Sequence, residues 1–135
     1  MSAALTFDNF TFSYQAATEA ELPAERFDAK PNQDGRLFIG PLYTEIEEGS
    51  FTLITGATGC GKTTLLRCCK PELAPNGIRA GSIKLFGQDS STLSVEESAS
   101  TVGFVMQNPD NQLVCSESWH ELAFGLETLA VSQAA

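Results

Sequence analysis

The sequence lacks the cysteine and histidine spacing of a zinc site, because it contains no C-x-x-C pair and only one histidine. No apolar run approaches the roughly 18–20 residues that a membrane-spanning helix needs. The N-terminus has no basic stretch followed by an apolar segment, so we expect no secretory signal and a cytoplasmic location. In a reducing cytosol we expect free thiols. The four cysteines are Cys60, Cys68, Cys69 and Cys115.

Positive charge is also scarce. The 135 residues include 8 Lys and Arg against 17 Asp and Glu, and the formal net charge is −9. An acidic surface repels phosphate backbones, so the composition predicts no binding to nucleic acid. A local exception to this acidic character is a group of three basic residues close together in the sequence, Lys62, Arg67 and Lys70. The length is sufficient for one domain with a modest core.

Alternating apolar and polar residues predict several strands. The alternation is interrupted at Asp8 and Asn9, where we expect an irregularity in the first strand. Phe51–Thr55 is short, mostly apolar and followed by a glycine, which is typical of a buried parallel strand. The segments predicted as strands are Leu5–Tyr14, Leu37–Ser50, Phe51–Thr55, Gly81–Phe86 and Thr101–Met106.

Start and stop signals predict three helices. The first runs from Gly61 to about Lys70 and is stopped by Pro71. Two more begin at capping boxes, in which a serine is followed three residues later by a glutamate. These boxes are Ser94 with Glu97 and Ser118 with Glu121. The Ala-, Glu- and Pro-rich stretch Gln15–Arg36 is predicted as an exposed loop or insertion.

The stretch GATGCGKT, residues 56–63, fits the pattern G-x-x-x-x-G-K-[ST] at every fixed position, between a β-rich run and a helix. In such a loop the glycines allow a tight turn, so that backbone N–H groups converge on a phosphate. The start of the following helix adds its positive dipole end. Lys62 reaches the β- and γ-phosphates, and the Thr63 hydroxyl coordinates Mg²⁺. The predicted nucleotide-binding residues here are Gly56, Ala57, Thr58, Gly59, Cys60, Gly61, Lys62, Thr63 and Thr64.

More than fifty residues precede this loop, whereas small GTPases carry it near the N-terminus, and the chain has no N-K-x-D guanine motif. Four segments in order, FTFSY, GATGCGKTTLL, GSIKLFGQD and VGFVMQNPDNQ, resemble the nucleotide-binding subunits of ATP-binding-cassette transporters. The segment NPDNQLVCSESWHELAFGLE, residues 108–127, is similar to the energy-coupling-factor and cobalt-type import ATPases within that family.

The resemblance implies an α/β fold, a truncated P-loop NTPase core with an N-terminal antiparallel β-subdomain of the ABC ATPase type. The β-subdomain would comprise about residues 1–50 and 78–90. The P-loop strand and helix would lie at about 51–70, the glutamine loop at about 101–112 and the start of the helical region at about 116–135.

Individual roles follow from the same resemblance. Tyr14 would stack on the adenine of ATP, although it could instead be a core aromatic, with Phe10 and Phe12 as neighbouring alternatives. Gln107 would contribute an oxygen to Mg²⁺ and sense the γ-phosphate. The segment Asn108–Glu121 would border the groove where a transmembrane subunit docks. A second ATP-binding subunit would pair head to tail, and the protein would lie peripherally on the inner face of the cell membrane.

The chain also departs from the family. It contains no Leu-Ser-Gly-Gly-Gln signature, no strand ending in a metal-binding Asp and catalytic Glu, and no switch histidine. We read His120 as a solvated helix residue and Trp119 as either partner-facing or buried at a helix start. We expect ATP binding without efficient hydrolysis by this chain alone, and no catalytic residue within it. The alternatives are a stand-alone non-catalytic nucleotide-binding module and a soluble cassette ATPase acting on DNA or ribosomes, which the acidic charge disfavours.

Overall fold

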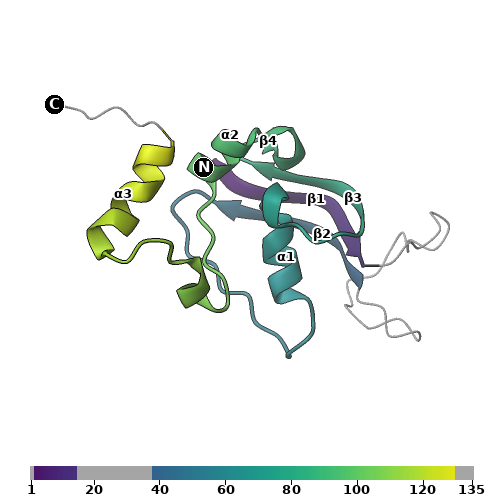
Figure 1. Ribbon diagram of the computed structural model, residues 1–135. Helices are drawn as coiled ribbons and strands as arrows, with labels where there is room; N and C mark the ends of the chain where they lie inside the picture. The colour runs from purple at the N-terminus through teal and green to yellow at the C-terminus, as the bar shows by residue number, and fades with distance from the viewer. Residues whose placement is uncertain (1, 15–37, 130–135) are drawn as a thin grey trace. The chain divides into compact units, whose positions relative to one another are not determined.

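The computed structural model describes residues 2–14 and 38–129 of the chain (Figure 1). The chain divides into two compact units, Met1–Ser94 and Val95–Ala135. Each unit is described by itself. The predicted loop Gln15–Arg36 lies outside the described residues.

A four-stranded antiparallel sheet forms the first unit, in the order β2-β1-β3-β4. The strand β1 lies inside the sheet and pairs with both β2 and β3. Three of the predicted strands are therefore confirmed, with bounds shifted by a few residues. The strands are β1 (Ala3–Ser13), β2 (Phe38–Glu47), β3 (Ile78–Leu85) and β4 (Gln88–Asp89).

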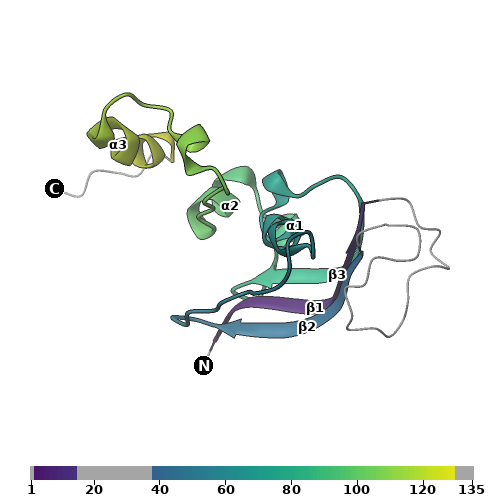
Figure 2. The same ribbon diagram turned by 90° about the horizontal axis from the view of Figure 1, so that it is seen from below.

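One face of this sheet is covered by the helix α1 (Lys62–Cys68), as Figure 2 shows. The apolar side chains of β1 that face the helix are buried, and Phe12 is completely so, with 0% exposure. Full burial of one large apolar side chain stabilises a fold by about 1.5–3 kcal/mol. The core therefore holds α1 to the sheet. Its members are Phe7, Phe10, Phe12, Ile39, Cys68, Cys69 and Ile83, with Leu5, Leu42 and Leu65 packed against them.

The irregularity predicted at Asp8 and Asn9 is confirmed as a bulge in β1. The register of β1 shifts here against both neighbouring strands, and Asn9 has a positive φ of 48°. Across the bulge, Gly81 also has a positive φ, of 73°, and a Cβ at this position would overlap the carbonyl oxygen of Asn9. Two independent reasons therefore favour glycine at position 81: its positive φ, and the close approach of the bulged strand, which leaves no room for a Cβ.

Short 3₁₀ turns complete the first unit, at Pro71–Leu73 and Ser90–Thr92. In the second unit, α2 (Val95–Thr101) is followed by a 3₁₀ turn at Pro109–Gln112 and by α3 (Ser118–Thr128). All three predicted helices are confirmed. The antiparallel sheet and the helices together confirm the α/β class.

Two predicted strands are wrong. Residues 51–55 form no strand, and Phe51 and Leu53 are 93% and 75% exposed. The segment predicted as Thr101–Met106 begins with the last residue of α2 and then continues without regular structure. A β-prone run becomes a strand only where a neighbouring strand pairs with its N–H and C=O groups. Neither run has such a neighbour among the described residues.

We expect Gly81→Ala to destabilise the first unit more than Gly87→Ala does. Both glycines have positive φ, 73° and 83°, so both substitutions carry a torsional cost of about 1 kcal/mol. Only at position 81 does the new Cβ also meet backbone atoms, whereas nothing lies within 4 Å at position 87. Urea unfolding of the two variants measures the difference. Equal losses in the free energy of unfolding would show that the bulge does not constrain this position.

Candidate functional site

The loop of residues 56–61 leads directly into α1. Gly61 is the N-cap residue of the helix, and its φ of 99° lies in the left-handed region. Gly56 and Gly59 also have positive φ, 153° and 82°. A Cβ on Gly56 would come within 2.8 Å of Cys60 Sγ. The glycine positions of the motif therefore correspond to a tight turn in which side chains other than hydrogen are disfavoured.

Lys62 is folded back over this loop. Its Nζ donates hydrogen bonds to the carbonyl oxygens of Gly56, at 2.7 Å, and Ala57, at 2.8 Å. It also lies 3.6 Å from Cys60 Sγ. An ammonium group held only by neutral carbonyls binds an anionic oxygen more strongly, because charge-assisted bonds to an ionised acceptor are about twice as strong. Lys62 is thus placed to exchange carbonyl partners for phosphate oxygens.

The backbone of the loop keeps donors free. In the described part of the chain, the loop makes backbone hydrogen bonds from Cys60 N to Ala57 O and from Leu65 N to Gly61 O. In the part of the chain that the structure describes, the N–H groups of Gly59, Gly61 and Thr63 have no protein acceptor. Unpaired amides beside a lysine fit the phosphate groups of a nucleotide.

The residues present also fit Mg²⁺ held jointly with phosphate oxygens. Thr63 is exposed at the start of α1, so its hydroxyl is accessible. Across the described residues, no group of three or more His, Cys, Asp or Glu side chains could hold a metal ion by itself. Mg²⁺ commonly takes few protein ligands and completes its shell with phosphate oxygens and water.

An apolar cavity of about 180 Å³ lies beside the loop. Its walls come from β2, from the loop and from Leu65 of α1, and they are mostly aliphatic. A triphosphate needs N–H donors and positive charge, so the amides of the loop fit it better than the lining of this cavity does.

Among the candidate aromatics, only Tyr14 is available to a ligand. Phe10 and Phe12 are buried in the core, at 3% and 0% exposure, whereas Tyr14 is 45% exposed at the end of β1. Its ring forms a T-shaped pair with that of Phe12, with 4.9 Å between centroids, and its hydroxyl lies 2.7 Å from Thr64 Oγ1. Tyr14 is therefore the accessible aromatic next to α1, and the contact with Thr64 was not expected from the sequence.

Gln107 belongs to the second unit, where it is exposed after Met106. The same loop contains a residue that the sequence reasoning missed. The side-chain amide of Gln112 accepts a hydrogen bond from Met106 N at 2.6 Å and donates one to Phe104 O at 3.0 Å. Gln112 thereby supplies the hydrogen bonds that a neighbouring strand would otherwise provide, and it closes the loop that carries Gln107. A glutamine in a polar loop gives no sequence signal of this role.

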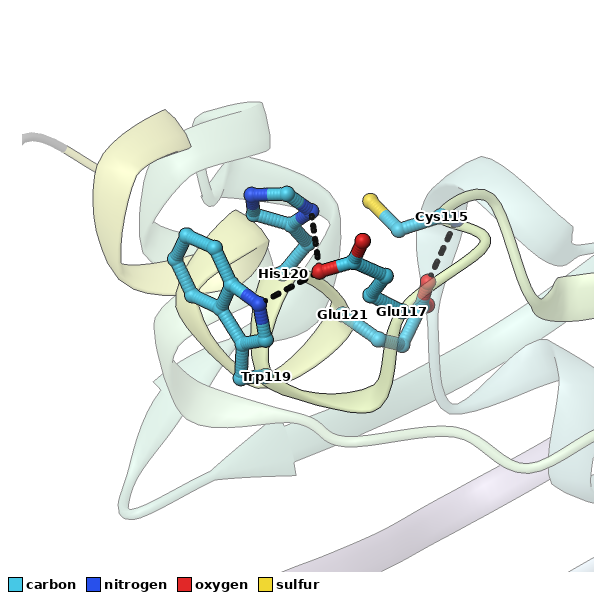
Figure 3. Close-up of polar contacts among 5 residues, drawn as sticks. All are labelled: Cys115, Glu117, Trp119, His120 and Glu121. Atoms are coloured by element: carbon cyan, nitrogen blue, oxygen red, sulfur yellow. Dashed lines mark hydrogen bonds and ion pairs between the residues drawn. The ribbon is translucent and has the colours of Figure 1, made fainter.

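The capping box predicted at Ser118 and Glu121 is wrong. The N-cap of α3 is Glu117, which makes no side-chain capping bond. Glu121 instead reaches past the helix start, and its Oε2 accepts a hydrogen bond from the N–H group of Cys115 at 2.7 Å (Figure 3). The same oxygen accepts a second one from the N–H group of Val114 at 3.0 Å. These bonds, from Cys115 first, lower the pKa of the Glu121 carboxyl below its ordinary value.

A second carboxylate organises the first turn of α3, as Figure 3 shows. Glu117 Oε2 accepts a hydrogen bond from Trp119 Nε1 at 2.6 Å and lies 3.8 Å from His120 Nδ1. Trp119 is 61% exposed, so it is not buried at the helix start within the described residues. The interpretation of His120 as a solvated helix residue agrees with the 47% exposure of its side chain.

Exposed apolar side chains gather along this part of the second unit. Such a concentration is typical of a surface that contacts another polypeptide. The large exposed ones are Leu113, Val114, Trp119, Leu122, Phe124 and Leu126.

The expectation of free thiols is confirmed for all four cysteines. Burial raises the pKa of the Cys69 thiol to about 12, and it also raises the pKa of Cys68. These two thiols are therefore unreactive core residues. None of the helices in the described ranges combines the length and the apolar character required to cross a membrane.

Comparison with known proteins identifies one family, described as ABC transporter, which matches residues 39–132. An ABC transporter ATP-binding protein of Methanosarcina mazei is 33% identical over 132 residues, which is 96% of this chain and 19% of the relative. One of Methanosarcina acetivorans is 41% identical over 91 residues, 66% of this chain and 14% of the relative. The energy-coupling factor transporter ATP-binding protein of Lactobacillus delbrueckii subsp. bulgaricus is 34% identical over 127 residues, 94% of this chain and 39% of the relative. The chain thus spans well under half the length of these relatives. No solved structure matches it.

We expect protonation of Glu121 to release the chain at residues 114 and 115. Because the pKa of this carboxyl is lower in the folded chain, its hydrogen bonds stabilise the turn at every pH above the ordinary Glu value of about 4.3. This stabilisation is lost as the pH falls through the lowered pKa. Amide hydrogen exchange at Val114 and Cys115, corrected for intrinsic rates, measures the loss of protection.

Glu121→Gln should remove this pH dependence, because its neutral amide still accepts a hydrogen bond but does not titrate. Glu117→Gln is the matched control, since the Glu117 carboxylate accepts from the side chain of Trp119 and, in the described part of the chain, from no backbone N–H group. The interpretation is wrong if Glu121→Gln and the unchanged chain show the same pH profile at these two amides.

Proposed function

Because the chain belongs to the ABC transporter family, we propose that it is the ATP-binding part of a membrane transporter that couples ATP binding and hydrolysis to solute uptake. The observation that carries the proposal is the loop of residues 56–63, in which unpaired backbone N–H groups and the Lys62 ammonium lie together at the start of α1. These are the donors that a triphosphate requires.

In this proposal each loop residue has a defined role. The backbone from Gly56 to Thr64 surrounds the phosphates, and glycine at 56, 59 and 61 lets the main chain approach them closely. Lys62 leaves the carbonyls of Gly56 and Ala57 and binds phosphate oxygens instead. The nucleotide site would thus form by exchange of the hydrogen bonds of the Lys62 side chain, with the backbone of the loop already in place.

Thr63 and Gln107 would hold Mg²⁺ through a hydroxyl and an amide oxygen. When bound, Mg²⁺ neutralises phosphate charge and orients the phosphate oxygens. Gln112 supports Gln107 through its two bonds to the preceding backbone. Tyr14 would present the exposed part of its ring to the adenine base.

The second unit supplies the proposed partner surface. We assign Asn108–Glu121 to contact with a transmembrane subunit, because this segment carries exposed apolar residues that include Leu113 and Trp119. A second ATP-binding domain would pair with this one head to tail. Both contacts would keep the protein on the inner face of the cell membrane. The similarity to the energy-coupling factor protein of Lactobacillus delbrueckii supports an importer of that type.

We expect Lys62→Ala to weaken binding of MgATP to the full chain by at least about ten-fold. The substitution removes the charged partner of the phosphates, and a charge-assisted hydrogen bond contributes about 1.5–3 kcal/mol. Isothermal titration calorimetry measures both affinities. Lys84→Ala is the matched control, because Lys84 is a lysine on β3 that pairs with Asp8. Equal affinity in Lys62→Ala and in the unchanged chain would refute the nucleotide site.

We also expect the chain alone to bind ATP without turning it over at the rate of a transport ATPase. Phosphoryl transfer to water needs a positioned nucleophile and metal-binding carboxylates, and no motif for them occurs in the 135 residues. Phosphate release from purified protein tests this expectation. Mg²⁺-dependent release that disappears in Lys62→Ala would contradict it.

A further inference from the structure

Two residues fifty positions apart meet beside the phosphate loop. The hydroxyl of Tyr14 lies 2.7 Å from Thr64 Oγ1, and either oxygen can donate. Thr64 is buried in the first turn of α1, two residues after Lys62, while Tyr14 directly follows β1, one of the two inner strands of the sheet. This contact links the exposed aromatic ring directly to the helix that carries the loop.

The other end of the Tyr14 ring is also held. It packs against the ring of Phe12 in a T-shaped pair with an interplanar angle of 88°, and Phe12 is completely buried. The surroundings of Phe12 are tight, because a Cβ on Gly77 would lie 2.8 Å from its ring carbons. Tyr14 therefore contacts the buried core through its ring and α1 through its hydroxyl, and 45% of the residue remains exposed.

We propose that Thr64 is a positioning residue, whose hydroxyl holds Tyr14 at a set distance from the phosphate loop so that base and phosphates are bound together. This inference rests on the proposed ATP site. An aromatic ring that is already oriented loses less side-chain freedom when a base stacks on it. The hydroxyl pair thus raises affinity for a nucleotide, whereas it contributes nothing to a ligand that has phosphates and no base.

A double-mutant cycle tests this proposal on the full chain. Tyr14→Phe keeps the stacking ring and removes its hydroxyl, and Thr64→Val keeps the branched shape and removes the partner hydroxyl. We expect each to weaken MgATP binding by about three- to ten-fold, the range of one hydrogen bond. The double variant should be no weaker than either single one, because both remove the same interaction.

Binding of magnesium tripolyphosphate, measured in parallel, separates positioning of the base from contact with phosphate. We expect it to be the same in all four proteins. Thr64→Ser should restore MgATP binding, because it returns the hydroxyl. Tyr43→Phe and Thr44→Val are the controls, since both change exposed residues of β2 in the same way and should bind like the unchanged chain.

Three results would overturn the inference. Additive losses in the double variant would mean that the two hydroxyls act separately. Equal weakening of tripolyphosphate binding would mean that Thr64 contacts phosphate itself. If ATP binding depends on Lys62 but is unchanged in Tyr14→Phe and in Thr64→Val, the positioning role is refuted while the proposed ATP site stands. If ATP binding does not depend on Lys62, the proposed function itself fails. Circular dichroism checks each fold, and Thr64→Ala replaces Thr64→Val if the valine variant does not fold.

Discussion

The packing of α1 on the aromatic side of β1 is the interaction on which the rest of the first unit depends. Phe7, Phe10 and Phe12 contribute the sheet side of this contact, and Cys68 and Cys69 the helix side. Burial of these groups holds the helix, and the helix in turn determines where the preceding glycine loop begins. The position of the amides proposed to bind phosphate is thus set by a small apolar core at the other end of α1. Both cysteines are part of that core, which explains why burial raises their pKa values.

The same strand leads to the aromatic residue of the candidate site. After the bulge at Asn9, β1 passes through buried Phe12, and half-exposed Tyr14 follows its end, so the chain runs here from the core to the surface. Lys62 and Tyr14 differ in how they are prepared for a ligand. The lysine must give up two carbonyl partners when phosphate binds. The net gain in binding free energy is therefore the difference between its bonds to phosphate and its bonds to these carbonyls. The tyrosine is already in place, so its contact with a base would carry a smaller entropic cost.

Much of this arrangement could be predicted from the sequence. Alternation located β1, β2 and β3, the interruption at Asp8 and Asn9 located the bulge, and the motif located the loop before α1. The runs at 51–55 and 101–106 were misjudged, because strand propensity describes one segment whereas a strand requires a second one to pair with. The roles of Glu121, Gln112 and Thr64 were not predictable either. Each depends on a side chain reaching a group that the fold brings near, and no spacing rule encodes such contacts.

The two misjudged runs have a common physical consequence. Phe51 and Leu53 precede the phosphate loop, and Val105 precedes Gln107, and all three are at least 75% exposed. Exposed residues of this size attract other apolar surface, because their burial would contribute about 25 cal/mol for each Å² removed from water. Each of the loops that carry Lys62 and Gln107 is therefore attached to an apolar segment that still has surface to bury. In the proposed ATP site, a polypeptide that covers these segments would fix the backbone that precedes both residues, and nucleotide affinity and association with that polypeptide would then be thermodynamically coupled.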